Sequence, residues 1–266
     1  MNRYLAILDH RTAALLLFCV LITALCLALD FSYDLNVTLF SIAVVFPLVF
    51  TIREAFKRRD AALEHLSQFS SALQAVHYAF EQVRKLSPAD KDHVATELHH
   101  IAELFLDVLP SPSSDNAAAV RRVNGLIGFI QERRQELSNS TIMKIIRFLQ
   151  DVHESMDNTL NIKRHGTPVS LRAYCLIFVF LFPAVFTPTI VYHLADKPTW
   201  IIYFMSLLHG FVLISLYNVQ VDMENPFDQI GLDDIQLDEF RFLRVEPAAL
   251  PPVDTTRGAG ESGGKG

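Results

Sequence analysis

Cysteine, tryptophan and glycine are scarce in this chain of 266 residues, which has 3, 1 and 10 of them respectively. The cysteines, Cys19, Cys26 and Cys175, all lie in uncharged stretches, so we expect neither a disulfide framework nor a reactive thiol. Basic residues number 23 against 29 acidic ones, and the net charge of −6 argues against nucleic acid as a partner. The sequence also lacks a nucleophile elbow, a phosphate-binding loop and a zinc-protease motif, so we expect no enzymatic activity and no cofactor.

Charged residues are missing from four long stretches, in which the hydrophobic 51% of the chain is concentrated. The first two have the minimum length for crossing the hydrocarbon core of a bilayer, and the last two are comfortably long. Four such stretches, paired as close hairpins, favour transmembrane helices over buried core helices. The four predicted spans are 12–29, 35–52, 173–192 and 198–221.

Basic residues gather at one side of these spans. Arg3 and Arg11 precede the first span, the second is followed by a basic stretch at 53–59, and the third is preceded by another at 163–172. The two short loops inside the hairpins hold one basic residue between them. Because Lys and Arg are enriched on the cytoplasmic side, we expect a multi-pass protein of the cell's inner membrane with both termini in the cytoplasm.

The segment between the second and third spans, residues 53–172, carries apolar residues at spacings of three and four. This period predicts four amphipathic helices packed as a cytosolic bundle. No strand pattern of any length is present, so the expected fold class is all-α. Residues 1–52 and 173–221 then form the membrane part, 222–246 an acidic cytosolic tail, and 247–266 a disordered end that is rich in Pro and Gly.

The second span continues without a break into charged sequence, because neither Pro nor Gly occurs between Leu48 and Leu86. Within its apolar part, Ile42, Phe46 and Phe50 recur every four residues and share one helical face. In a ring of subunits this face would form stacked apolar rings and a hydrophobic constriction. The alternative is that the three residues only pack between helices.

Charged residues next to the membrane are candidates for contact with ions and with the tail. Arg53, Lys57 and Arg58 form a basic collar directly after the second span. The tail is acidic from Asp222 onward, and we expect it to dock near this collar and hold adjacent subunits together. The acidic tail lacks the pattern of an EF-hand calcium loop.

One group of residues in the middle segment could bind a metal. His93, Glu97 and His100 share a helical face, but a second Glu-x-x-His pair of the kind that di-iron sites use is missing. A solvated polar face is the favoured interpretation, and a metal-dependent membrane enzyme is the weaker one. His209, inside the fourth span, is interpreted as a structural histidine that faces protein or water.

Three stretches, in this order along the chain, resemble the bestrophin channels, especially their short bacterial members. They are LVFTIREAFKRRDAAL (48–63), GTPVSLRAYCLIFVFLFP (166–183) and VDMENPFDQIGLDDIQLDEF (221–240). Asn225, Pro226 and Phe227 form the most specific match. The chain departs from the family at Asp228, where Gly is usual, and at Arg59, which replaces a Trp.

The resemblance implies an all-α homopentamer with four transmembrane helices per subunit and a cytosolic helical bundle around one central pore. Ile42, Phe46 and Phe50 would line a hydrophobic neck that conducts small inorganic ions, either anions (commonly chloride) or monovalent cations. Of the acidic run that binds calcium in animal members only Asp233 and Asp234 remain, as weak calcium candidates. The resemblance further implies that Asn225, Pro226 and Phe227 dock the tail. The expected partners are therefore membrane lipids, small ions and further copies of the chain.

A second class of function fits the same organisation. A membrane-anchored interaction or signalling protein would use the cytosolic helices to bind a partner and the spans only as an anchor. The sequence leaves the permeant ion, the gating stimulus and the physiological role open.

Overall fold

Helices make up nearly all of the described chain. The structure, a computed structural model, describes residues 9–113, 115–166, 168–229 and 234–243. These residues contain seven α-helices, a short 3₁₀ turn and no strand, so the predicted all-α class is confirmed.

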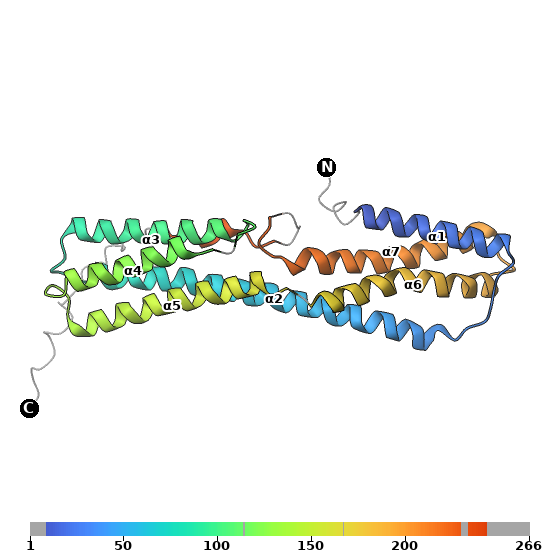
Figure 1. Ribbon diagram of the computed structural model, residues 1–266, viewed down its shortest axis with the longest axis horizontal. Coiled ribbons are helices and arrows are strands. Elements are labelled where there is room, and N and C mark those ends of the chain that lie inside the picture. The colour runs from blue at the N-terminus through green and yellow to red at the C-terminus, as the bar shows by residue number, and fades with distance from the viewer. Residues whose placement is uncertain (1–8, 114, 167, 230–233, 244–266) are drawn as a thin grey trace, which may run out of the picture.

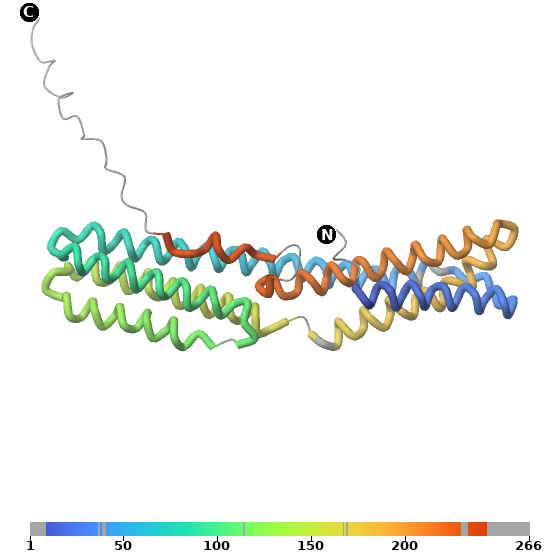
Figure 2. The backbone as a smooth tube through the Cα atoms, turned by 90° about the horizontal axis from the view of Figure 1, so that it is seen from above, coloured from blue at the N-terminus to red at the C-terminus, as the bar shows by residue number. Residues whose placement is uncertain are grey.

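Two groups of helices lie end to end, and the 45-residue helix α2 (Val37–Glu81) runs through both of them (Figures 1 and 2). Its first part, residues 37–52, packs against α6 (Val169–His193) and α7 (Thr199–Glu224), and α1 (His10–Ala28) packs against the same two helices from the other side. We call this group the membrane bundle. Its core joins residues of all four helices, namely Leu15, Cys19, Val44, Leu48, Cys175, Val179, Ile214 and Tyr217.

The second part of α2, residues 53–81, packs against α3 (Pro88–Val108) and α5 (Asn139–Arg164), and α4 (Ala117–Glu132) packs against α3 and α5, at the other end of the molecule (Figure 1). We call this group the polar bundle. The predicted apolar stripes form its core, including Leu66, Phe69, Leu73, Val76, Phe80, Leu98, Ile101, Phe105, Ile145, Leu149 and Val152. The stripes meet here because each polar helix can hide its apolar side only against another such helix.

Three helices of the described chain are long and apolar enough to cross a membrane, namely 10–28, 170–193 and 199–224. They correspond to the first, third and fourth predicted spans. Both α6 and α7 are continuous helices through these stretches, and α6 stays helical at Pro183 and Pro188, although neither proline has an N–H to donate to the preceding turn. The fourth candidate is the first part of α2, and its place in a membrane stays a prediction.

Helix starts in the polar bundle follow the capping signals of the sequence. Ser87 Oγ accepts a hydrogen bond from Asp90 N at 3.1 Å, and Pro88 occupies the first turn of α3. Ser138 Oγ caps α5 in the same way through Thr141 N, also at 3.1 Å. Each cap satisfies a backbone N–H that the helix cannot pair. Helices α3 and α5 therefore each begin directly after a serine cap.

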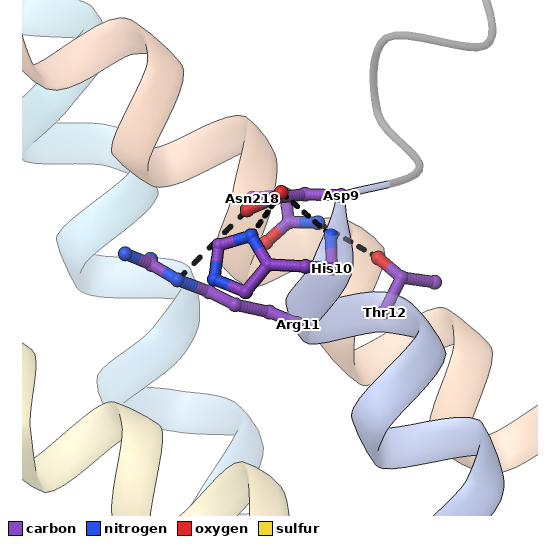
Figure 3. Close-up of polar contacts among 5 residues, drawn as sticks. All are labelled: Asp9, His10, Arg11, Thr12 and Asn218. Atoms are coloured by element: carbon purple, nitrogen blue, oxygen red, sulfur yellow. Dashed lines mark hydrogen bonds and ion pairs between the residues drawn. The ribbon is translucent and has the colours of Figure 1, made fainter.

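The first turn of α1 is joined to the last turns of α7 (Figure 3). Asp9 caps α1 by accepting a hydrogen bond from His10 N at 2.6 Å, and its carboxylate lies 3.9 Å from Arg11 Nε. From α7, Asn218 Nδ2 donates a hydrogen bond to Thr12 Oγ1 at 3.0 Å. Since both of these side chains are buried, their hydrogen bond fixes the register of the two helices.

Candidate functional site

The three apolar residues predicted to form a constriction project from one exposed face of α2. The exposed fractions of Ile42, Phe46 and Phe50 are 46%, 56% and 55%, and the two phenyl rings lie 5.9 Å apart. On the opposite side of the helix, Val44 and Leu48 are 3% and 1% exposed. The face therefore points away from the membrane bundle of its own chain.

Exposure alone does not distinguish a pore from a lipid contact, because lipid also accepts apolar side chains. Leu17, Leu21 and Leu25 of α1 share a face and are 61%, 59% and 57% exposed. What differs on α2 is the continuation of the face. A spacing of three or four residues carries it from Phe50 to Arg53 and Lys57, which are also exposed. This face is apolar in its first part and charged immediately afterwards.

Polar contacts hold α2 at the point where the face changes from apolar to charged. The buried hydroxyl of Thr51 lies 2.8 Å from the backbone oxygen of Leu48 and 2.8 Å from Gln220 Oε1 of α7. It also lies 3.9 Å from Cys175 Sγ of α6. A hydroxyl shared between helices in a packed core resists rotation of α2 about its own axis. These contacts on the buried side of α2 therefore fix the direction in which its exposed face points.

The structure separates the three residues of the predicted collar. Arg53 and Lys57 are exposed, and Lys57 Nζ forms an ion pair of 2.7 Å with Glu54, one turn back on α2. Arg58 is half-buried and turned toward the polar bundle, where its Nη2 donates to the backbone oxygen of Ile162 at 2.7 Å. Burial lowers the pKa of Arg58, and so does Arg172, whereas Glu224 raises it.

The predicted docking residues of the tail lie at the end of α7. Phe227 is completely buried in the core of the polar bundle. Asn225 Nδ2 donates to Asp228 Oδ2 at 3.0 Å, and the backbone oxygen of Pro226 accepts a hydrogen bond from Ile235 N at 2.9 Å. These bonds fold the chain after α7 back onto the bundle.

The remainder of the described tail follows α2 and α3 (Figure 2). Phe240 and Phe242 are buried in the same core, and the ring of Phe242 meets the His77 ring edge-on at 5.6 Å. Arg241 forms ion pairs with Glu103 of α3 and with Asp238. Phe240 and Phe242 thus add to the expected docking residues Asn225, Pro226 and Phe227, and two phenylalanines in an acidic tail are a signal for docking onto a core.

The metal candidates do not come together in the described chain. Asp233 lies outside the described residues, and no group of three or more potential metal ligands, with or without Asp234, occurs within them. Glu97 instead forms an ion pair of 2.8 Å with Arg122 of α4, and the His93 ring lies 5.3 Å from that of Phe129. These contacts agree with the interpretation of a polar helix face.

His209 is held by its own membrane bundle. Its Nδ1 lies 2.7 Å from the backbone oxygen of Met205, one turn back on α7, and its ring lies 4.7 Å from that of Phe186 on α6. A histidine with a hydrogen-bond partner and an aromatic ring packed against it has a structural explanation.

Comparison with known proteins identifies the fold. No family model and no curated protein matches the sequence. Among solved structures, a variant of a bacterial bestrophin homologue from Klebsiella pneumoniae matches with a TM-score of 0.73 and 16% identity, over 86% of this chain and 92% of that one. The chain has the bestrophin fold.

Two further structures support the assignment. Another variant of the Klebsiella pneumoniae bestrophin homologue gives a TM-score of 0.72 at 15% identity and covers 86% of this chain and 94% of that one. A crystal structure described as that of a membrane protein gives a TM-score of 0.72 at 15% sequence identity and covers 86% of this chain and 93% of that one. Coverage of this extent includes residues of both the membrane bundle and the polar bundle, so the predicted resemblance to bestrophins is confirmed at the level of fold.

Proposed function

We propose that this chain is one subunit of a ring-shaped bestrophin-like membrane channel for small ions, with α2 lining the pore. The observation that carries the proposal is the single exposed face of α2, which is apolar at Ile42, Phe46 and Phe50 and charged from Arg53 onward. Copies of this helix arranged around an axis enclose a path with an apolar neck and a charged vestibule. The bestrophin fold supports this arrangement, because the family resemblance implies a channel.

The neck acts as a hydrophobic barrier rather than a charged filter. Residues 35–52 contain no Lys, Arg, Asp or Glu, so no ring of charge can select ions there. A narrow apolar ring controls ions by dewetting, because stripping water from an ion without replacing its contacts costs free energy. Selection between anions, commonly chloride, and monovalent cations then falls to the charged residues next to the neck, where Arg53 and Lys57 alternate with Glu54.

The proposal requires a closed ring of identical subunits. Subunits that contact one another head to tail form a ring when the rotation from each subunit to the next adds up to a full turn. The number five comes from the bestrophin resemblance. In this assembly each subunit contributes four spans, with both termini and the polar bundle in the cytoplasm. Native mass spectrometry of the full chain in mild detergent measures the number of subunits, and a monomer or dimer would exclude the pore.

Ion flux from liposomes tests the function. We expect vesicles with the purified full chain to release ions down a gradient, and separate chloride and potassium gradients to identify the permeant ion. The variant in which Ile42, Phe46 and Phe50 are all replaced by Ala should assemble and conduct more, because its neck is wider. The matched control carries Leu17→Ala and Leu21→Ala, which remove equally exposed apolar side chains from α1.

The results separate the alternatives. Flux of the control should equal that of the parent chain. If the parent releases no ions, the membrane-anchored interaction protein becomes the better explanation. If the triple variant assembles and conducts like the parent, α2 lines no constriction and the neck assignment is wrong.

A further inference from the structure

A cavity of about 470 Å³ lies at the junction of the two bundles, away from the exposed face of α2. It is built where α5 ends, α6 begins and α7 ends, and the loop after α3 closes one side. The side chains that determine its chemistry are those of Arg58, Lys163, Arg172 and Glu224, with Gly166 leaving space between them.

The position of the cavity relative to the spans is defined by two of these residues. Arg172 lies in the first turn of the candidate span 170–193, and Glu224 is the last residue of the candidate span 199–224. With the membrane bundle in a bilayer, both side chains lie at the border where hydrocarbon gives way to headgroups. The cavity is therefore at the depth of lipid phosphates.

Positive charge exceeds negative charge in the cavity. Three cationic side chains face one carboxylate, that of Glu224, which is 6% exposed and lies 2.6 Å from Arg172 Nη2. Burial lowers the pKa of Lys163, as does neighbouring Arg164. Burial also lowers the pKa of Arg58, and Arg172 adds to this while Glu224 opposes it. Groups that share a partly buried site with like charges are stabilised by a further anion.

The hydrogen bonds of the three cations divide them into a structural group and two binding groups. Lys163 Nζ donates to the backbone oxygens of Val108, Ser111 and Ser113 at 2.7, 2.6 and 2.5 Å, so it secures the loop and contributes only charge. Arg172 Nε is buried and has no hydrogen-bond partner among the described residues. Arg58 uses one N–H for the backbone oxygen of Ile162, and a guanidinium offers five.

Gly166 leaves the cavity open. A Cβ atom at this position would lie 3.6 Å from Glu224 Oε1 and 3.9 Å from Arg58 Nη1, so that any longer side chain would extend over the two groups. A substitution here can fill the cavity without removing a charge.

We propose that this junction cavity binds the phosphate ester of an anionic ligand between Arg58 and Arg172, and that an anionic phospholipid of the adjoining leaflet supplies it. Guanidinium groups match phosphate oxygens in a planar, two-bond geometry, and basic pockets at span ends select anionic headgroups. The same chemistry would accept a soluble phosphate ester, so the test includes one. The proposal requires the membrane bundle to lie in a bilayer but does not require a pore.

Native mass spectrometry of the detergent-purified full chain, titrated with phosphatidylglycerol or phosphatidylcholine, measures the binding. We expect selective retention of phosphatidylglycerol. Arg58→Gln with Arg172→Gln should weaken it by about tenfold or more, since two charge-assisted hydrogen-bonding groups are lost. Gly166→Leu should weaken it comparably by filling the space. The matched control is Arg53→Gln with Lys57→Gln, which removes the same charge at the same border but outside the cavity, and it should bind like the parent.

Glycerol phosphate, added as a competitor, distinguishes the two sources. Displacement of phosphatidylglycerol only at concentrations far above that of the lipid supports a lipid site, and displacement at equal concentrations assigns the cavity to a soluble phosphate ester. Equal retention of both lipids, or equal phosphatidylglycerol binding by the parent and all variants, overturns the proposal. Should the double variant fail to fold because Glu224 loses its partners, Gly166→Leu decides, since it keeps every charge.

Discussion

The sulfur of Cys19 occupies the space in which a side chain at Gly210 would begin. A Cβ atom built on Gly210 would lie 2.6 Å from Cys19 Sγ, closer than such atoms approach one another in proteins. Both residues are buried, and they join α1 to α7 in the middle of the membrane bundle. The backbone of α7 is thus in direct contact with a side chain of α1, as in other close crossings of membrane helices through small residues.

Replacing Gly210 by Ala should destabilise the membrane bundle. The added methyl group forces α1 and α7 apart, and overpacking of this kind costs about 1–3 kcal/mol. The measurement is the free energy of unfolding in detergent by chemical denaturation. The double variant Gly210→Ala with Cys19→Ala lacks the colliding sulfur, and its unfolding free energy should recover most of what Gly210→Ala alone loses.

Two other glycines provide the control. A Cβ atom added to Gly125 or Gly128 of α4 would have no heavy atom within 4 Å, so an Ala there meets open space. At these sites we expect Ala to stabilise the helix by about 0.5–1 kcal/mol, because Gly is the poorer helix former. Destabilisation of the same size at all three positions would contradict the packing explanation.

Phe227 should anchor the tail to the polar bundle. Its side chain is completely buried, and truncation of such a ring to Ala typically costs about 3–5 kcal/mol. Phe227→Ala should therefore lower the unfolding free energy strongly and make the segment after α7 accessible to protease. Leu243→Ala, at a side chain that is 72% exposed, should change stability by less than about 0.5 kcal/mol. Equal protease resistance of the parent and Phe227→Ala would show that the tail is held elsewhere.

Asp90 should make the stability of the polar bundle dependent on pH. Hydrogen bonds from Arg133 and from the Ser87 hydroxyl hold the pKa of this carboxyl below its ordinary value. A group whose pKa is depressed in the folded state contributes stability above the unfolded pKa of about 3.9 and loses that contribution as the pH falls through the folded pKa. Asp90→Asn should therefore lower the melting temperature at pH 7 and do so much less at pH 3.

A second substitution isolates the ion pair. In a background of Arg133→Gln, the effect of Asp90→Asn at pH 7 should be smaller than in the parent, because the principal partner is already gone. A pH-independent difference between the parent and Asp90→Asn would assign the loss to the helix cap alone.

The topology can be read from engineered cysteines. Ser32 and Lys197 lie in the loops inside the two predicted hairpins, whereas Ser113 lies in the loop after α3. Because basic residues gather beside the polar bundle, an impermeant thiol reagent outside the cell should label positions 32 and 197 but not 113. The three native cysteines are buried, so labelling of the parent chain measures the background. External labelling at position 113 would reverse the proposed orientation.

Local patterns were sufficient to predict the helices. The apolar stripe from Leu66 to Phe80 is buried on α2 as expected, because a period of 3.6 residues determines which side chains share a face. Helix starts at Ser87 and Ser138 were predictable for a similar reason, since a cap involves residues that are only three apart.

Side-chain direction and long-range pairing were harder to predict. Arg58 follows Lys57 directly, but one residue turns the helix by about 100°, which carries Arg58 off the exposed face and into the junction. The ion pair between Arg241 and Glu103 joins residues that are 138 positions apart, and no local pattern marks such a partner. The shared face of Ile42, Phe46 and Phe50 follows from their spacing, whereas the proposed neck also requires other copies of the chain.

The length of α2 has a mechanical consequence. A helix of 45 residues at 1.5 Å per residue forms a rod of about 67 Å that passes through both bundles. Twisting its far end turns Phe46 and Phe50 in the same sense, since successive turns are coupled by backbone hydrogen bonds. The weakest coupling lies at Pro47, which has no N–H to offer the preceding turn. The missing bond would join Pro47 to the backbone oxygen of Ala43, so the rod is most compliant in the turn from Ala43 to Pro47. Torque applied in the polar bundle therefore reaches Phe50 through an intact helix and is taken up in the turn that contains Phe46.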